Sequence, residues 1–440
     1  MRLFQRSIAM CLVGTMAAVV RPDGALAQSV QQVPPRSNVE TSSSTLGATS
    51  LTLAQALERA LANNPGLRSA EREIEAADGA IEQGSAIPNP ELSYEMEDTR
   101  KETRTNTLML TQPLELGGKR AARISAAERG RDVAQAQLAT KRAEVRGQTH
   151  DAWREVLAAQ EGQRLAEDAT KLAQRATQAA ARRVQAGSAS PLEETRARLE
   201  ELNARLAQAQ AESTLAASRT RLAALWGQPQ ADFARVEGRL DDLPGVPSAE
   251  ALLDRLDETP AMRVATHESA RSQALTDIER SRRYPDVNVS VGVKRATELG
   301  RNQTILGLSL PLPLFDSNRG NLREALARNA QAQDALQATR STLTSELLQA
   351  RNRLTASRME AEGLAREVVP AAQSALDAAT RGYELGKFGL IDLLDAQRSL
   401  FQMKTQQLRA WLDTHKAAAE IARLLGDAAD SLPPTPTSAR

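Results

Sequence analysis

The sequence predicts an α+β fold of long antiparallel coiled-coil helices and two β-hairpins, with one half of the chain repeating the other. Only 2% of the 440 residues are aromatic, whereas alanine, leucine, glutamine, arginine and glutamate are abundant. This composition is typical of long helices packed closely side by side, not of ordinary globular cores. Two stretches instead alternate apolar and polar residues with the period of a β-strand. A motif containing glycines also occurs twice.

The repeat is clearest at these glycines. Gly187 corresponds to Gly386, and Gly227 to Gly426, at one constant offset. Gly187, Gly386 and Gly389 lie between long helical stretches, where glycine permits a tight turn. The constant offset indicates an internal duplication, so each half is expected to contain the same elements in the same order.

The beginning of the chain has the features of a cleaved export signal. Positive charges precede an apolar stretch over residues 7–20, which is too short to span a membrane as a helix, and small residues follow up to Ala27. Lipidation of the single cysteine, Cys11, is the alternative. The expected segments are a signal peptide at 1–27, a flexible segment at 28–50, a first repeat at 51–247, a second repeat at 248–427 and a disordered tail at 428–440.

Helical spacing of apolar residues runs through most of both repeats. The longest helix is expected over residues 119–186, which contain no proline and would extend roughly 100 Å at about 1.5 Å per residue. In a later helix, Leu199, Leu202 and Leu206 keep coiled-coil spacing and predict a packing seam. The other expected helices span residues 53–63, 66–83, 192–225, 249–259, 261–282, 321–385 with an interruption at Pro370, and 390–425.

The alternating stretches predict one hairpin near residues 91–114 and another near 286–314. In the second hairpin, Val287, Val289 and Val291 share one face. Four such strands cannot close a membrane barrel, because the smallest barrels need about eight and open edges in lipid leave backbone groups unpaired. Several chains must therefore pool their strands. Together with the export signal and the long helices, this predicts a tube standing on an outer membrane.

Carboxylates lie at the starts of the two helices that follow the glycine turns. We expect Asp392 and Asp395 in the first turn of one helix, and Glu193 and Glu194 follow Pro191 at the start of the other. Free N–H groups and the helix dipole both favour negative charge at that end. From the sequence alone, the only role of these four residues could be to stabilise the starts of the two helices.

The sequence argues against several functional classes. With a formal net charge of +1, the chain lacks the excess of basic residues that is typical of nucleic-acid-binding proteins. His150, His267 and His415 are isolated from one another, so neither a metal site nor a cofactor is predicted. The Leu-Gly-Gly-Lys stretch lacks the spacing and the hydroxyl residue of a phosphate loop. Without a nucleophile–base pair or paired acids in a pocket, the chain is not expected to be an enzyme.

Two motifs carry a resemblance to a known family. Residues 112–120 are Gln-Pro-Leu-Glu-Leu-Gly-Gly-Lys-Arg, and residues 392–396 are Asp-Leu-Leu-Asp-Ala. With the repeated halves of hairpin and coiled coil, they resemble the TolC-like outer-membrane efflux factors over about residues 51–426. The Glu-Leu-Gly-Gly-Lys-Arg segment is similar to the branch that serves cobalt–zinc–cadmium (Czc-type) heavy-metal efflux.

The resemblance implies a homotrimer in the outer membrane of a Gram-negative bacterium. Four strands from each of three chains would form a twelve-stranded β-barrel, and the helices would form a periplasmic α-barrel. It further implies docking to a periplasmic membrane-fusion adaptor and to an inner-membrane pump of the resistance–nodulation–division (RND) class. Metal cations would be the transported substrate, and the channel would be a passive exit duct.

The resemblance also implies roles for residues at the periplasmic entrance. Asp392 and Asp395 would form stacked rings of carboxylates, which attract cations and raise one another's pKa. Tyr383 matches a family tyrosine that helps to close the entrance, and Glu193 lies where its carboxylate partner is expected. The family arginine is absent, because Phe388 stands at its position with Lys387 beside it. Tyr383 could instead be only a packing aromatic.

Two alternatives to a metal channel follow from the same sequence. An outer-membrane factor that exports drugs or other organic solutes would have the same fold. A periplasmic coiled-coil adaptor or scaffold without a pore would use the helices but would have no use for four alternating strands.

Overall fold

The computed structural model describes residues 50–427. The expected signal peptide, the segment from 28 to 49 and the tail at 428–440 lie outside the described residues. Ser50, which we expected to end the flexible segment, begins strand β1 (Ser50–Leu51). This strand pairs in parallel with β4 (Arg235–Val236), a contact that the sequence did not predict.

The first half begins with two helices that share a boundary residue. Asn64 ends α1 (Leu53–Asn63) and caps α2 (Pro65–Ser85), because its side-chain oxygen accepts the N–H of Gly66 at 2.9 Å. Its amide group donates to the carbonyl of Leu225 at 2.8 Å, which ties this junction to the end of α4. The remaining elements are β2 (Glu91–Glu97), β3 (Thr105–Leu114), α3 (Lys119–Gln185) and α4 (Pro191–Ala224).

The second half follows the same order with two differences. The first helix is split into α5 (Ala249–Leu253) and a short 3₁₀ turn (Leu256–Glu258). The long helix does not stop at Pro370; a π-helical turn (Leu364–Val368) precedes the proline, which sits in the first turn of α8, where its missing N–H is tolerated. The other elements are α6 (Pro260–Ser281), β5 (Val287–Ala296), β6 (Arg301–Ser309), α7 (Arg319–Gly363), α8 (Val369–Glu384) and α9 (Leu390–Leu425).

The two hairpins join into one antiparallel sheet in the order β2-β3-β5-β6. Leu110 faces Val291 across the central β3–β5 pair, and Val291 faces Leu306 on β6. Leu306 and Leu308 are 81% and 75% exposed, so none of the described residues covers the apolar face of the sheet. Strands β2 and β6 each have one unpaired edge in this sheet.

The second hairpin is shorter than its alternation predicted. Leu310, Leu312 and Leu314 lie beyond the end of β6. Pro311 and Pro313 interrupt this stretch. They have no N–H to contribute to the ladder, so the alternation continues without strand pairing.

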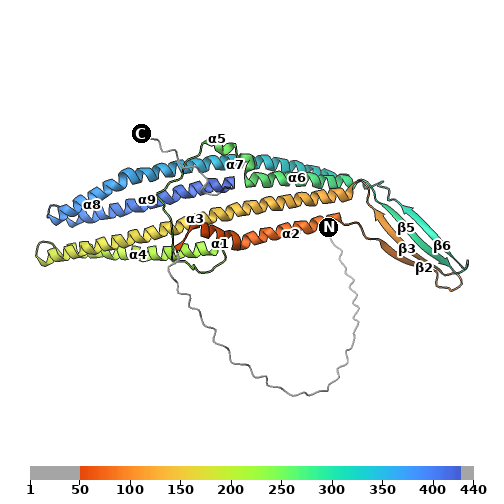
Figure 1. Cartoon of the computed structure of the whole chain (residues 1–440), viewed down its shortest axis with the longest axis horizontal. Coiled ribbons are helices and arrows are strands. Elements are labelled where there is room, and N and C mark those ends of the chain that lie inside the picture. The colour runs from red at the N-terminus through yellow and green to blue at the C-terminus, as the bar shows by residue number, and fades with distance from the viewer. Residues whose placement is uncertain (1–49, 428–440) are drawn as a thin grey trace, which may run out of the picture. The chain divides into compact units, whose positions relative to one another are not determined.

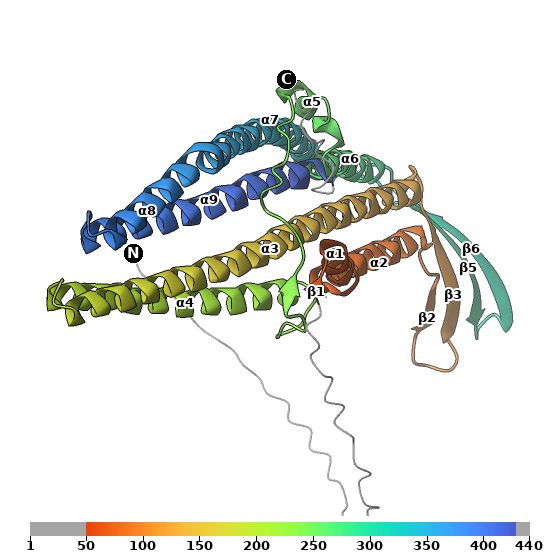
Figure 2. The same ribbon diagram turned by 60° about the vertical axis from the view of Figure 1, so that its left-hand side comes forward.

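Helix α3 packs along α2, α4, α6 and α9, while α7 packs along α6 and α9 (Figures 1 and 2). One core cluster joins α1, α3 and α4 around Trp153, Leu222 and Trp226. A second joins α7 and α9 through Leu347, Leu354 and Ile421. Alanines fill much of the remaining contact between helices, as the composition predicted.

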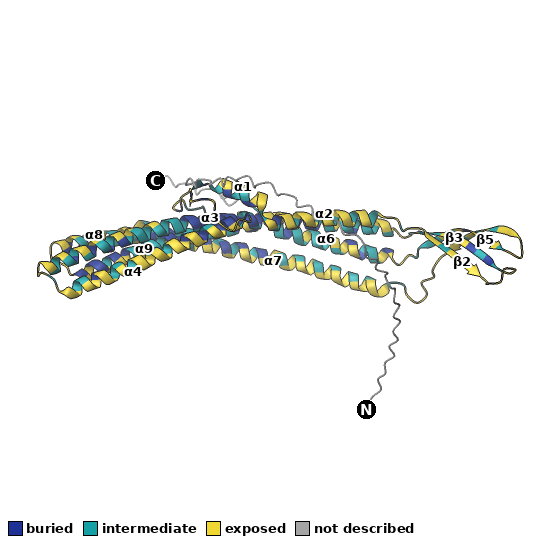
Figure 3. Cartoon of the chain, turned by 90° about the horizontal axis from the view of Figure 1, so that it is seen from below, coloured by how far each residue is buried: buried dark blue, intermediate teal, exposed yellow. Residues whose placement is uncertain are grey.

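The predicted leucine seam of α4 does not face α3. Leu199, Leu202 and Leu206 are between 50% and 71% exposed. Instead, the buried residues of this helix are Ala197 near its start and Leu215, Ser218, Leu222 and Ala223 near its end. Exposed residues accordingly run along α4 in Figure 3. Among residues 50–427, therefore, nothing covers the heptad-spaced stripe of Leu199, Leu202 and Leu206.

The segment that connects the two halves, residues 227–248, is fastened to three long helices by side chains. The amide group of Gln160 on α3 bonds both the N–H and the carbonyl of Val236, at 2.8 and 3.1 Å. His415 on α9 lies 3.0 Å from the carbonyl of Leu240. Arg358 on α7 donates to the carbonyl of Pro244 at 2.6 Å. Figure 2 shows the segment crossing the helices toward α5.

Candidate channel entrance

The two helix–helix turns lie at the same end of the helical layer, opposite the sheet (Figure 1). Both turns close in the same way. Gly187 and Gly386 adopt φ of +70°, a left-handed conformation that favours glycine. The N–H of Ser188 donates to the carbonyl of Arg183 at 2.9 Å, and the N–H of Lys387 donates to the carbonyl of Gly382 at 2.8 Å. The repeated glycines therefore serve one repeated helix-ending motif.

The third predicted turn glycine has a different role. Gly389 has a φ of −78°, which any residue can adopt, and it is the N-cap of α9. Its N–H donates to Oδ2 of Asp392 at 3.0 Å. Asp392 therefore stabilises the helix start, in agreement with the helix-start interpretation, while remaining exposed.

Asp395 lies one turn further along α9 than predicted, outside the first turn. Its side chain is 62% exposed, and Oδ1 accepts a hydrogen bond from Nη1 of Arg398 at 3.1 Å. Arg398 also donates to Oε1 of Glu200 on α4 at 2.6 Å. One arginine thus links α9 to α4 near the turns, a link that the sequence reasoning missed. The spacing of Asp395 and Arg398 suits a pair on one helix face, but nothing local indicated Glu200.

Tyr383, in the last turn of α8, is only 4% exposed. It packs in a cluster with Ala180 of α3 and Leu390 of α9. Its hydroxyl group is buried and has no hydrogen-bond partner among the described residues. The guanidinium carbon of Arg183, in the last turn of α3, lies 4.7 Å from the centroid of the Tyr383 ring.

Glu193 is half-buried at the start of α4, and its Oε2 atom has no hydrogen-bond partner in the described part of the chain. It therefore makes no hydrogen bond with the Tyr383 hydroxyl. Phe388 packs against Gly382, where an added Cβ would lie only 2.0 Å from the phenylalanine ring. Lys387 is exposed. The structure thus brings the tyrosine to the turns but joins it to an arginine instead of a carboxylate.

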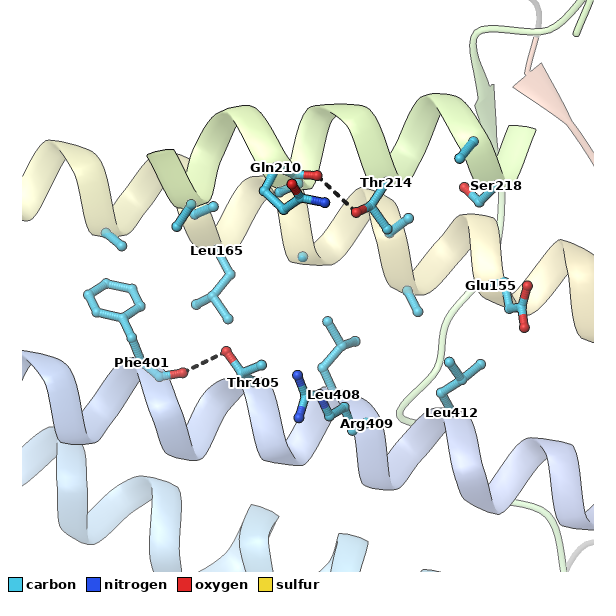
Figure 4. Close-up of a pocket in the computed structure, with 18 of the residues that line it drawn as sticks. Glu155, Leu165, Gln210, Thr214, Ser218, Phe401, Thr405, Leu408, Arg409 and Leu412 are labelled. Carbon is cyan, nitrogen blue, oxygen red and sulfur yellow. Dashed lines mark hydrogen bonds between the residues drawn. The ribbon is translucent and has the colours of Figure 1, made fainter. Parts of the chain in front are cut away.

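A groove of about 640 Å³ lies farther from the turns, between α3, α4 and α9 (Figure 4). Alanines and the side chains of Leu165, Phe401 and Leu408 form most of its lining. Glu155 lies at one end and pairs with Lys416 of α9 and Arg221 of α4 at 2.7 and 2.6 Å. The groove is mainly apolar. It contains none of the residues predicted at the entrance, which we call the entrance set: Asp392, Asp395, Tyr383, Glu193 and Lys387.

The histidines are dispersed through the described helices. His150 and His415 are buried, at 1% and 6% exposure. Among residues 50–427, no group of three or more histidine, cysteine, aspartate or glutamate side chains is arranged to hold a metal ion. Within that same range, no helix is both long and apolar enough to cross a bilayer.

Known metal-resistance proteins resemble this chain, one of them over nearly all of its length. It is 45% identical over 419 residues to the cobalt-zinc-cadmium resistance protein CzcC of Cupriavidus metallidurans, covering 94% of this chain and 98% of that protein. It is 33% identical over 290 residues to the nickel and cobalt resistance protein CnrC of the same species, covering 64% of this chain and 69% of that protein.

Solved structures share the fold at lower sequence identity. The outer-membrane channel OprN gives a TM-score of 0.72 with 21% identity, covering 85% of this chain and 89% of that one. VceC of Vibrio cholerae gives a TM-score of 0.72 with 20% identity, covering 85% and 96%. The model of the family described as outer membrane efflux protein matches residues 56–228 and again 252–427. The chain therefore belongs to the outer membrane efflux protein family.

Proposed function

We propose that the protein is the outer-membrane channel of a tripartite efflux system and a passive exit duct for divalent heavy-metal cations. The observation that supports this proposal most strongly is the 45% identity to a cobalt-zinc-cadmium resistance protein across 94% of this chain. Resemblance to nickel and cobalt resistance proteins supports the same class of substrate. A channel acts by guiding ions through its pore, so it has no need of a catalytic site or a cofactor.

The sheet supports a trimer in which three chains pool their strands. Each chain offers four strands, an exposed apolar face and two unpaired edges. Such edges are strongly unfavourable in lipid unless another chain pairs with them. A β2 edge meeting the β6 edge of the next copy would close a barrel of twelve strands, the number that the family resemblance implies.

The helices support the same assembly. The exposed stripe of Leu199, Leu202 and Leu206 on α4 requires an apolar partner in a stable coiled coil. Helix α8 offers exposed Ala371 and Ala375 on its own surface. Leucines of one copy packing against these small residues of the next would continue the helical wall into a periplasmic α-barrel.

Internal duplication accounts for the two separate matches of one family model and for the repeated order of elements. We propose repeats at residues 51–247 and 248–427. The connecting segment, residues 227–248, then forms the end of the first repeat and leads into the second.

The entrance of this channel lies, in our proposal, at the two glycine turns. Asp392 and Asp395 are exposed there and would form carboxylate rings in a trimer, which favour cations without holding them tightly. Exposed Lys387 and half-buried Glu193 complete the entrance set with Tyr383. A periplasmic membrane-fusion adaptor would dock at this end and connect the channel to an inner-membrane RND pump.

Membrane fractionation and planar-bilayer recording test the proposed function. Expressed full-length protein is expected in the outer-membrane fraction as a trimer, and the purified trimer is expected to conduct cations in preference to anions. A monomer in the periplasmic fraction would instead indicate the non-pore scaffold. Outer-membrane channels that show no cation preference would favour export of drugs or other organic solutes.

A further inference from the structure

Four linkers connect the sheet to the helices, and each presents a large apolar or aromatic side chain to solvent. The linkers lie at the end of the sheet that is nearer the helices, where β2 and β5 begin and β3 and β6 end (Figure 1). Their exposed side chains include Ile87, Leu116, Tyr284, Leu314 and Phe315, which we call the collar. Each is at least 45% exposed, and Phe315 is fully exposed. A group of this kind marks an interaction surface, whereas single exposed apolar residues do not.

Tyr284 is held in place by the Leu-Gly-Gly-Lys stretch. A Cβ added to Gly117 would lie 2.6 Å from the side chain of Tyr284, so the ring rests directly on the backbone of that glycine. Gly117 also has a φ of +71°, which favours glycine. Asp286 joins the same two linkers, because its Oδ1 atom accepts the N–H of Leu116 at 3.2 Å and pairs with Nζ of Lys119 at 2.7 Å. The stretch therefore fixes an aromatic side chain that remains exposed.

The apolar face of the strands is too short to match a membrane without the collar. On β5 this face runs from Val287 to Val293, which is about 20 Å along the strand at roughly 3.4 Å per residue. A tilt of about 40° reduces this length to roughly 15 Å of depth, whereas the apolar band of outer-membrane barrels is about 25 Å tall. Beyond Val293 the face continues with Arg295, which lies between Asn106 and Asn302. The missing depth must therefore come from the other end, where the collar lies.

The segment after β6 carries the apolar face toward the helices. Leu310, Leu312 and Leu314 are all exposed there. Pro311 and Pro313 alternate with them and have no N–H groups that would need partners in lipid. This segment can thus extend the apolar band where strand pairing has ended.

Lipid covers the collar better than another copy of the chain would. A second copy would pair with the edge strands β2 and β6, whereas Leu116 follows β3 and Tyr284 precedes β5, the two central strands. Exposed Arg283 and Arg319 lie beside Tyr284 and four residues after Phe315. Their positive charges suit the anionic phosphate groups of phospholipids.

We propose that the collar binds the headgroup boundary of the phospholipid leaflet that faces the periplasm. The proposal rests on the proposed channel function, which places the sheet in the outer membrane. Aromatic side chains favour this boundary, and Tyr284 can keep its hydroxyl group in water while its ring lies against acyl chains. The collar thereby sets how deeply the sheet sits in the membrane.

Tryptophan fluorescence in vesicles tests the collar. Full-length Phe315→Trp would be placed in vesicles of phosphatidylethanolamine and phosphatidylglycerol whose acyl chains carry bromine, a quencher of tryptophan, either near the headgroup or near the chain end. After subtraction of the wild-type signal, bromine near the headgroup is expected to remove about half of the added emission, and bromine near the chain end less. Leu308→Trp, on the apolar face of β6, is the positive control and should respond more to bromine near the chain end. Met359→Trp, at an exposed position of α7 far from the sheet, should keep its emission.

The outcomes separate the collar from the channel. Quenching of Leu308→Trp without quenching of Phe315→Trp would overturn the proposal and leave the channel intact. Quenching of neither would overturn both the proposal and the membrane sheet of the proposed function. A disulfide between Ile87→Cys of one copy and Phe315→Cys of the next, absent when either cysteine is present alone, would show that another copy covers the collar and would also overturn the proposal.

Discussion

Burial raises the pKa of Asp151 on α3 to about 6, from an ordinary value of 3.8. Loss of hydration is the main cause, and it outweighs the attraction of Arg154, Lys416 and Arg423. The Oδ1 atom of Asp151 is buried without a hydrogen-bond partner among the described residues. This carboxylate therefore destabilises the folded chain when it is charged.

The sign of the pH dependence follows from proton binding. Between pH 3.8 and about 6 the folded state binds more protons at Asp151 than the unfolded state does. The free energy of unfolding therefore falls as pH rises through this window, and the loss is complete above it. The change in pKa corresponds to a loss of about 3 kcal/mol in the free energy of unfolding.

Asp151→Asn removes this charge with little change of shape. The variant is expected to be more stable than the wild type at pH 8 by on the order of 1–3 kcal/mol, and to lose that advantage at pH 4. Denaturant unfolding at the two pH values measures the difference. Asp334→Asn, at an exposed position on α7, is the control. An equal gain at both pH values would show that charge is not the cause.

The carboxylates of the proposed entrance can be tested separately. Asp395→Ala and the double change Asp392→Ala with Asp395→Ala are expected to weaken the block of single-channel current by zinc or cobalt ions, because they remove rings of negative charge. The double variant also loses the cap at Gly389, at about 0.5–2 kcal/mol of helix stability. Asp377→Ala, on the exposed surface of α8, is the control. Unchanged block in the double variant would exclude the ring.

At the scale of elements, the exposed stripe on α4 gives a sharp test of assembly. Leu199→Gln, Leu202→Gln and Leu206→Gln together are expected to abolish the trimer while leaving the helix content intact, because each of these side chains is at least half exposed in the single chain. Sedimentation in detergent and circular dichroism measure the two properties. Arg196→Gln with Asn203→Gln changes exposed polar residues of the same helix as the control. A trimer that survives the triple change would place the interface elsewhere.

If three chains together form one β-barrel, the second hairpin of each chain is needed for insertion into the membrane. Deleting residues 284–315 removes β5 and β6 and leaves each chain with one hairpin, so the protein is expected to disappear from the outer-membrane fraction. Leu299→Ser, in the turn between these strands, should have no such effect. A deletion variant that still forms trimers in the membrane would contradict the role given to the strands.

Much of the order of elements could be predicted because its determinants are local. Asn64 and Pro65 set a helix boundary, the absence of proline allows the long α3, and alternation marks the strands. Residues 310–314 were assigned to a strand wrongly, because alternation continued past the last residue able to pair. The leucines of α4 keep coiled-coil spacing, but spacing does not reveal whether the partner belongs to the same chain.

The candidate site could be predicted only as a set of residues. The turn glycines, Asp392 and Tyr383 carry local patterns that place them at the turns. Arg183, which contacts Tyr383, and Glu200, which contacts Arg398, lie far away in the sequence, and no pattern near the turns identifies them. Contacts between helices depend on how the two halves pack, and a single sequence does not contain that information in local form.

At the scale of the whole molecule, the fold and the substrate rest on different observations. Solved channels with 20% and 21% identity share the fold with this chain and therefore define only its architecture. The proposed substrate rests on the 45% identity to a cobalt-zinc-cadmium resistance protein. The proposed partners rest on the same relationship, because the proposed passive duct would need a pump to drive export.

Metal tolerance tests the central claim most directly. A strain that lacks its own outer-membrane factor would receive this gene together with a Czc-type pump and adaptor. The account predicts restored growth on zinc, cobalt or cadmium without a gain in tolerance to antibiotics or detergents. Restoration for organic toxicants alone would contradict the metal substrate, and no restoration of any kind would contradict the channel itself.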